Sequence, residues 1–264
     1  MRPLAVIGNL SRDVVADAPP RVGGGTYYAA RALRLAGIEA RIGTKCAQGD
    51  RDLLRRLVAL GLPVSWHPAA ATTAFSFAYD GDHRRMSVDE LGEPWQPREA
   101  CDAIGDAVWV HVAPLTRADF PAATLAALAR GRRLSFDGQG LVRVPRTGPL
   151  ELDDDFDPAV LRHVRILKLA EEEAGVIGVE GESRLRELGV PEIVLTHGSR
   201  GSVVWWRGRL HEVPAQPVGR VVDPTGAGDA FGVSYLAARA LGYEPPGAAR
   251  RAAFVVSTML SRGR

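Results

Sequence analysis

A glycine-rich segment towards the end of the chain combines a backbone suited to binding an anion with a carboxylate. Residues 223–229 read DPTGAGD, and an apolar helical pattern follows them. Helix N-termini carry unpaired N–H groups that can face a phosphate. The amides of Gly226, Ala227 and Gly228 could therefore neutralise a phosphoryl group, while Asp229 accepts the proton of an attacking hydroxyl. The segment predicts phosphoryl transfer. The simpler alternative is a glycine-rich turn in which Asp229 is only a first-turn acid.

Three other segments hold residues that could serve the same chemistry. Glycines 23–25 precede an alanine-rich helical pattern, and the turn 196–201 (THGSRG) follows an apolar run. Residues 166–174 (ILKLAEEEA) combine an apolar strand pattern with three consecutive glutamates. Taken singly, these segments are a loop before a helix, a turn and an acidic first helical turn.

Together the segments resemble the ribokinase (PfkB) family of carbohydrate kinases. Residues 223–231 are similar to the family's C-terminal signature, and residues 23–37 to its Gly-Gly segment and first long helix. The turn 196–201 resembles the Thr-x-Gly-x-x-Gly turn beside the nucleotide phosphates, and residues 166–174 resemble the segment that carries Asn-x-x-Glu in the family. The resemblance extends over almost the whole chain.

This resemblance implies a magnesium-dependent kinase that transfers the γ-phosphoryl group of ATP to a hydroxyl of a small sugar or cyclic polyol. It makes Asp229 the general base and assigns the anion hole to Gly226, Ala227 and Gly228. The residues implied for nucleotide binding are Lys168, Thr196, Gly198 and Gly201, with Gly226 and Gly228. Those implied for acceptor binding are Asn9, Asp13, Gly23, Gly24, Gln139 and Arg143.

The metal site departs from the family pattern at one position. Glu173 falls on the glutamate that helps to organise magnesium, but Ala170 stands where the family has asparagine. Organisation of the metal should then depend more on Glu173, or on a neighbour such as Glu172. Lys168 would lie along the phosphates, although an ordinary lysine at the end of a strand is an equal alternative. The sequence leaves open whether a monovalent cation (K⁺) binds beside Asp223 and Thr225, as it does in some relatives.

The acceptor is the least determined part of the prediction. Residues 137–143 (DGQGLVR) resemble a stretch in the family's myo-inositol kinase-like branch, and also more general sugar-kinase patterns. The resemblance would let Gln139 and Arg143 contact ring hydroxyls or phosphates. A surface position for Arg143 is equally compatible with the sequence. A nucleoside or a vitamin-like alcohol is an alternative acceptor, and aromatic side chains such as Tyr27, Tyr28 or Phe75 would favour the nucleoside. Another alternative is a catalytically silent regulator that binds a sugar or nucleotide.

The alternation of apolar segments predicts a single α/β domain with a doubly wound, mostly parallel sheet. The predicted strands are 4–8, 39–43, 107–112, 133–137, 164–168, 192–196 and 202–206, and the predicted helices are 26–36, 51–60, 119–130, 229–241 and 245–260. Ligands of such sheets bind at the carboxyl ends of the strands, where the segments above fall. Residues 73–79 and 84–88 predict a β-hairpin. The family resemblance implies that it belongs to a small β lid over the acceptor site, formed by about residues 10–22 and 72–90; the alternative is an edge hairpin packed on the main sheet.

Composition excludes several other classes of protein. The 264 residues are 46% hydrophobic and carry a formal net charge of +2, with basic residues spread along the chain, which argues against nucleic-acid binding. Cys46 and Cys101 lack metal-ligand spacing, and no run approaches the roughly 20 apolar residues of a membrane helix. We expect a cytoplasmic enzyme with a small-molecule substrate; a homodimer stays open.

Overall fold

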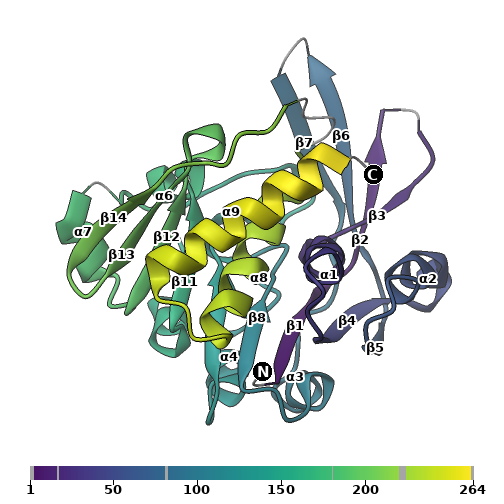
Figure 1. Ribbon diagram of the computed structural model, residues 1–264. Helices are drawn as coiled ribbons and strands as arrows, with labels where there is room; N and C mark the ends of the chain where they lie inside the picture. The colour runs from purple at the N-terminus through teal and green to yellow at the C-terminus, as the bar shows by residue number, and fades with distance from the viewer. Residues whose placement is uncertain (1–2, 17, 81–82, 180, 220–223, 263–264) are drawn as a thin grey trace.

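A large sheet forms the centre of the molecule (Figure 1). The computed structural model describes residues 3–262 apart from 17, 81–82, 180 and 220–223. Within these residues the sheet has nine strands in the order β14-β13-β12-β11-β9-β8-β1-β4-β5, and from β12 to β5 all neighbours are parallel. The strands are β1 (Leu4–Asn9), β4 (Arg41–Ala47), β5 (Val64–Ala69), β8 (Trp109–Val112), β9 (Arg133–Asp137), β11 (Ile166–Ala170), β12 (Glu192–Thr196), β13 (Ser202–Trp206) and β14 (Arg209–Val213).

Helices cover both faces of this sheet, because its central strands are apolar on both sides. In β1, for example, Leu4 and Val6 belong to one buried cluster, and Ala5 and Ile7 to the other. The first cluster is closed by α1 (Gly25–Leu35), α2 (Arg51–Val58), α8 (Ala227–Ala240) and α9 (Pro245–Arg262). The second is closed by α3 (Pro97–Ile104), α4 (Ala122–Leu128), α5 (Gln139–Val142), α6 (Glu171–Val176) and α7 (Gly181–Glu187). This doubly wound arrangement confirms the predicted fold class.

A smaller sheet stands beside the carboxyl ends of the large sheet's strands (Figure 1). Its order is β10-β7-β6-β2-β3, formed by β2 (Ser11–Val15), β3 (Arg21–Gly23), β6 (Thr73–Asp80), β7 (His83–Glu90) and β10 (Gly148–Pro149). β6 pairs with β7 as a hairpin and with β2 in parallel. Only Leu10 separates β1 from β2, so the chain passes directly from one sheet into the other.

Some element boundaries differ from the sequence prediction. The helix expected at 119–130 begins at Ala122, because the proline at 121 disfavours helical backbone in the residue before it. The edge strand β5 escaped prediction since it contains Pro68, which only an edge strand tolerates. None of the described helices is long and apolar enough to cross a membrane.

Candidate active site

Two cavities meet at the N-terminus of α8. The first has a volume of about 240 Å³ and lies between the smaller sheet and the ends of β9 and β11. The second, of about 610 Å³, lies between α9 and the turn after β12. Pro224, Ala227 and Gly228 line both cavities. A ligand in one cavity can therefore react with a ligand in the other across the first turn of this helix.

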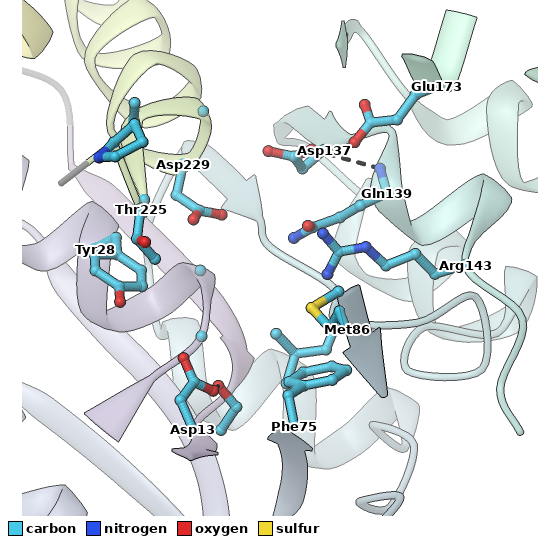
Figure 2. Close-up of a pocket in the computed structure, with 18 of the residues that line it drawn as sticks. Asp13, Tyr28, Phe75, Met86, Asp137, Gln139, Arg143, Glu173, Thr225 and Asp229 are labelled. Atoms are coloured by element: carbon cyan, nitrogen blue, oxygen red, sulfur yellow. Dashed lines mark hydrogen bonds between the residues drawn. The ribbon is translucent and has the colours of Figure 1, made fainter. Parts of the chain in front are cut away.

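Asp229 stands in that first turn and faces the first cavity (Figure 2). Gly226, at the N-cap, has a φ of 79°, and a Cβ there would lie 2.2 Å from the Tyr28 ring. Gly25 makes room for the Asp229 carboxylate, because a Cβ at position 25 would lie 2.9 Å from Asp229 Oδ1. Burial, reinforced by the charge of Asp137, raises the pKa of Asp229 to about 7. A carboxyl group with this pKa is matched to general-base work near neutral pH.

A buried cluster of charges lies next to the backbone at the start of α8. Lys168 Nζ is 3.1 Å from Asp137 Oδ1 and 3.8 Å from Glu173 Oε2, and a Cβ on Gly228 would lie 3.2 Å from it. Burial alone would lower the pKa of the Lys168 ammonium, but the carboxylates of Asp137, Glu173 and Asp229 outweigh it and raise that pKa. The lysine stays cationic where a phosphoryl group would meet Gly228. Strand pairing creates the cluster, since Lys168 on β11 is in register with Asp137 on β9.

Glu173 is oriented by the backbone at the position where the family has asparagine. The Ala170 amide donates to Glu173 Oε2 at 2.7 Å, which holds the carboxylate without an asparagine side chain. Burial is the largest influence on Glu173 and raises its pKa, although Lys168 opposes this effect. The described residues include no group of three or more His, Cys, Asp or Glu placed to hold a metal ion. Glu173 and Asp137 are carboxylates at this cavity that could assist in holding a magnesium ion, which commonly keeps several water ligands and binds phosphate oxygens.

Asp13 lines the first cavity together with Gly24. Its Oδ1 accepts a hydrogen bond from Ser11 Oγ at 2.6 Å. Gly23 provides the space for this carboxylate, because a Cβ there would lie 2.1 Å from Asp13 Oδ2. Asn9, in contrast, does not line either cavity; its Nδ2 donates to the Glu93 carbonyl at 3.2 Å.

We expect Gly23→Ala to weaken acceptor binding. The added methyl must displace the Asp13 carboxylate, and hydrogen bonds to a charged group are worth about 1.5–3 kcal/mol, so KM for the acceptor should rise about 10–100-fold. The KM for the donor should change little. Steady-state kinetics with each substrate varied in turn checks this, with Gly49→Ala as control because its Cβ would meet nothing within 4 Å. Equal behaviour of the two variants would contradict the role of Gly23.

Gln139 and Arg143 lie on the opposite wall of the first cavity (Figure 2). Gln139 Nε2 donates to the Pro114 carbonyl at 2.6 Å, which leaves its amide oxygen for a ligand hydroxyl. Within the described part of the chain, the Arg143 guanidinium has no carboxylate at ion-pair distance. The structure thus places Arg143 at the cavity rather than on an outer surface.

Tyr28 and Phe75, two of the aromatic residues considered for a nucleoside acceptor, line the first cavity, and so does Asp137 at the end of β9. Sequence reasoning missed Ser11, Phe77, Met86 and Leu115, of which the last three form an apolar side with Phe75. Strand alternation in the hairpin was the available signal for Phe75 and Phe77, which point to one face of β6. Tyr27 does not line the cavity.

The second cavity holds the other predicted nucleotide residues. Thr196, Gly198 and Gly201 line it at the turn after β12, and Phe231, Ala253, Val256 and Leu260 add an apolar surface. Gly201 has a φ of 102°, and a Cβ on it would lie 2.3 Å from the Val213 carbonyl oxygen. The residues predicted for the nucleotide are therefore divided between the cavities, with Lys168 in the first.

Comparison with known proteins assigns the chain to a family. Residues 11–263 match the sequence model of the "pfkB family carbohydrate kinase". The chain belongs to this family. A solved pfkB relative, described as a pyrophosphate-dependent kinase in the ribokinase family complexed with a pyrophosphate analog and myo-inositol, superposes with a TM-score of 0.84 at 25% identity. The match covers 97% of this chain and 94% of that one.

Curated relatives of this pfkB-family chain match over shorter stretches. A nucleoside kinase of Methanocaldococcus jannaschii is 40% identical over 55 residues, which is 21% of this chain and 18% of that protein. An inositol 3-kinase of Zea mays is 35% identical over 104 residues, which is 39% of this chain and 24% of the relative. The matched stretches thus span less than half the length of these relatives.

Proposed function

We propose that this pfkB-family protein transfers the γ-phosphoryl group of ATP to a hydroxyl of a small cyclic polyol or sugar, with myo-inositol as the first candidate. The observation that carries the proposal is the position of Asp229, at the helix end shared by the two cavities. One cavity would hold the acceptor and the other the nucleotide.

In the proposed reaction, the acceptor hydroxyl loses its proton to the Asp229 carboxylate as its oxygen bonds to the γ-phosphorus. The bond between that phosphorus and the β–γ bridging oxygen breaks, and ADP leaves with the electron pair. The amides of Gly226, Ala227 and Gly228 and the Lys168 ammonium would neutralise charge on the transferred group. Asp13 and Arg143 would hold other acceptor hydroxyls through charge-assisted hydrogen bonds, which are about twice as strong as neutral ones. Gln139 would add a neutral hydrogen bond through its amide oxygen.

Glu173, with Asp137, would organise magnesium through water. Each of these carboxylates has one oxygen engaged by Ala170 N or Lys168 Nζ and a second oxygen left for a water ligand. When bound, magnesium would neutralise charge on the donor phosphates. Thr225 lines the first cavity, whereas Asp223, its predicted partner for K⁺, lies outside the described residues.

The second cavity supports a nucleotide as donor. Its apolar surface around Phe231 and Val256 suits a purine ring, and its volume of about 610 Å³ is within the range for nucleoside-sized ligands. Pyrophosphate, the donor named for the solved relative, would leave this surface uncovered.

The first cavity supports a small acceptor. Its volume of about 240 Å³ lies below the roughly 300–1,000 Å³ typical of larger ligands, and its apolar side faces a polar wall. A ring with hydroxyls on its rim and C–H groups on its face fits both surfaces. Because the aromatic rings of Tyr28 and Phe75 line the cavity, a nucleoside is the second candidate for the acceptor.

A catalytically silent regulator has less support. The missing family asparagine at position 170 weakly favours such a regulator, but the Ala170 amide holds Glu173 without it. Cytoplasmic location and a homodimer stay predictions.

The pH dependence follows from the pKa of Asp229. Because burial and Asp137 raise it to about 7, the base is deprotonated above that pH and is protonated as the pH falls. We expect kcat/KM to fall about tenfold per pH unit below roughly 7. Asp137→Asn should move the fall in kcat/KM to lower pH, since it removes a negative charge that raises the pKa of Asp229. Rate profiles from pH 5 to 9 for both substrates check this, and a profile that is flat to pH 5 would contradict it.

The function is tested by measuring ADP release from Mg-ATP with myo-inositol, ribose, fructose, 2-keto-3-deoxygluconate, adenosine and cytidine. Parallel reactions use pyrophosphate as donor and phosphate release as readout. Turnover with one polyol or sugar and ATP supports the proposal. Turnover with adenosine or cytidine alone would favour the nucleoside alternative, and binding without turnover would favour the regulator.

A further inference from the structure

The loop between β8 and α4 connects a buried carboxylate to the acceptor wall. Asp119 is 3% exposed and does not line either cavity. Its Oδ2 accepts a hydrogen bond from the Leu115 amide at 2.8 Å, and its Oδ1 accepts one from Thr116 Oγ1 at 2.9 Å. Within the described residues Asp119 has no cation at ion-pair distance, so hydrogen bonds from its own loop are its direct partners, and the Arg143 guanidinium acts on it only from farther away. A buried carboxylate without a counterion is unfavourable for stability, which indicates another reason for its presence.

The same loop holds both polar groups of the opposite wall. The Pro114 carbonyl accepts the 2.6 Å hydrogen bond from Gln139 Nε2, and the Arg117 amide donates to the Arg143 carbonyl at 3.1 Å. Leu115 itself lines the first cavity. The two hydrogen bonds to Asp119 thus fix Leu115 and Thr116, which lie between the contacts made by Pro114 and Arg117.

We propose that Asp119 is a positioning residue for the acceptor site, which acts through loop 113–119 on Gln139 and Arg143. It does not touch the substrate. Its carboxylate keeps the loop in the one conformation in which Pro114 and Arg117 meet their partners. The inference rests on the proposed function, because it assigns acceptor recognition to these two side chains.

Protonation of Asp119 should have the same effect as its removal. Burial raises its pKa to about 6, although the loop hydrogen bonds and the Arg143 guanidinium oppose the shift. Below pH 6 the neutral acid would lose one of its two acceptor roles, so the acceptor KM should rise as pH falls through that value. Asp229 acts differently, because its protonation lowers kcat/KM for both substrates.

The test compares wild type, Asp119→Asn and Thr116→Val, with KM for myo-inositol and for ATP measured from pH 5.5 to 8. In Asp119→Asn we expect an acceptor KM about tenfold higher and independent of pH, with the ATP KM within about twofold of wild type. Thr116→Val removes one hydrogen bond to the Asp119 carboxylate, so its acceptor KM should rise by a smaller factor. If Asp119→Asn does not fold, the test is made with Thr116→Val. The exposed Asp106→Asn is the matched control.

Equal rises in both KM values, or an unchanged acceptor KM in a folded variant, would overturn the inference. If the wild type turns over myo-inositol and only the variant result fails, the proposed function stands. If the wild type turns over no polyol or sugar, the proposed function fails and the inference fails with it.

Discussion

Asp229→Asn should lower kcat by about 10²–10⁴-fold, the contribution typical of a general base. The amide has nearly the same shape but cannot accept the acceptor's proton. Nucleotide binding should persist, because the second cavity is lined mainly by residues of the turn after β12, the loop after β14 and α9. Single-turnover kinetics and ATP titration separate the two effects.

An unchanged kcat in this variant would contradict the assignment of Asp229 as base. A simultaneous loss of ATP binding would instead indicate that the substitution disturbed the start of α8. Gly25→Ala offers an independent check, because the added Cβ would lie 2.9 Å from Asp229 Oδ1. This variant should lower kcat by displacing the Asp229 carboxylate, which stays chemically intact.

Lys168→Met should have the second-largest effect, on both activity and stability. Loss of a charge that faces the transferred group typically lowers kcat by about 10²–10³-fold. The variant also leaves Asp137 and Glu173 buried without their cation, and breaking a buried pair costs about 3–5 kcal/mol. Turnover at saturating substrate and thermal unfolding measure the two effects.

Lys45 provides a matched control for this experiment. It is also buried, and its Nζ lies 2.7 Å from Glu99 Oε2, but it lines neither cavity. Lys45→Met should therefore lower the unfolding temperature while kcat stays near that of wild type. A similar loss of kcat in both variants would show that the effect at Lys168 comes from destabilisation and not from phosphoryl transfer.

The parts of the site that lie within one segment were predictable from the sequence. The arrangement of Gly226, Gly228 and Asp229 follows from local chemistry, since a glycine-rich turn into a helix presents amides and a first-turn carboxylate together. The parallel sheet was equally predictable, because its strands are short apolar runs that alternate with helical patterns.

The contacts between distant segments were not predictable. The pairing of Lys168 with Asp137 depends on the register between β9 and β11, which no local pattern specifies. The space that Gly23 leaves for Asp13 depends on the register between β2 and β3 in the same way. For Asn9, the position along the chain was predictable but the direction of the side chain was not. The residue ends β1, as expected, and its side chain donates to the Glu93 carbonyl outside the cavity.

The shared wall of the two cavities has a stereochemical consequence. Because Ala227 and Gly228 line both spaces, a donor and an acceptor bound together would approach the same phosphorus from opposite sides. The phosphoryl group would then pass between them in one displacement and never rest on the protein. Under the proposed chemistry, each turnover inverts the configuration at phosphorus, and both substrates must be bound before either product leaves.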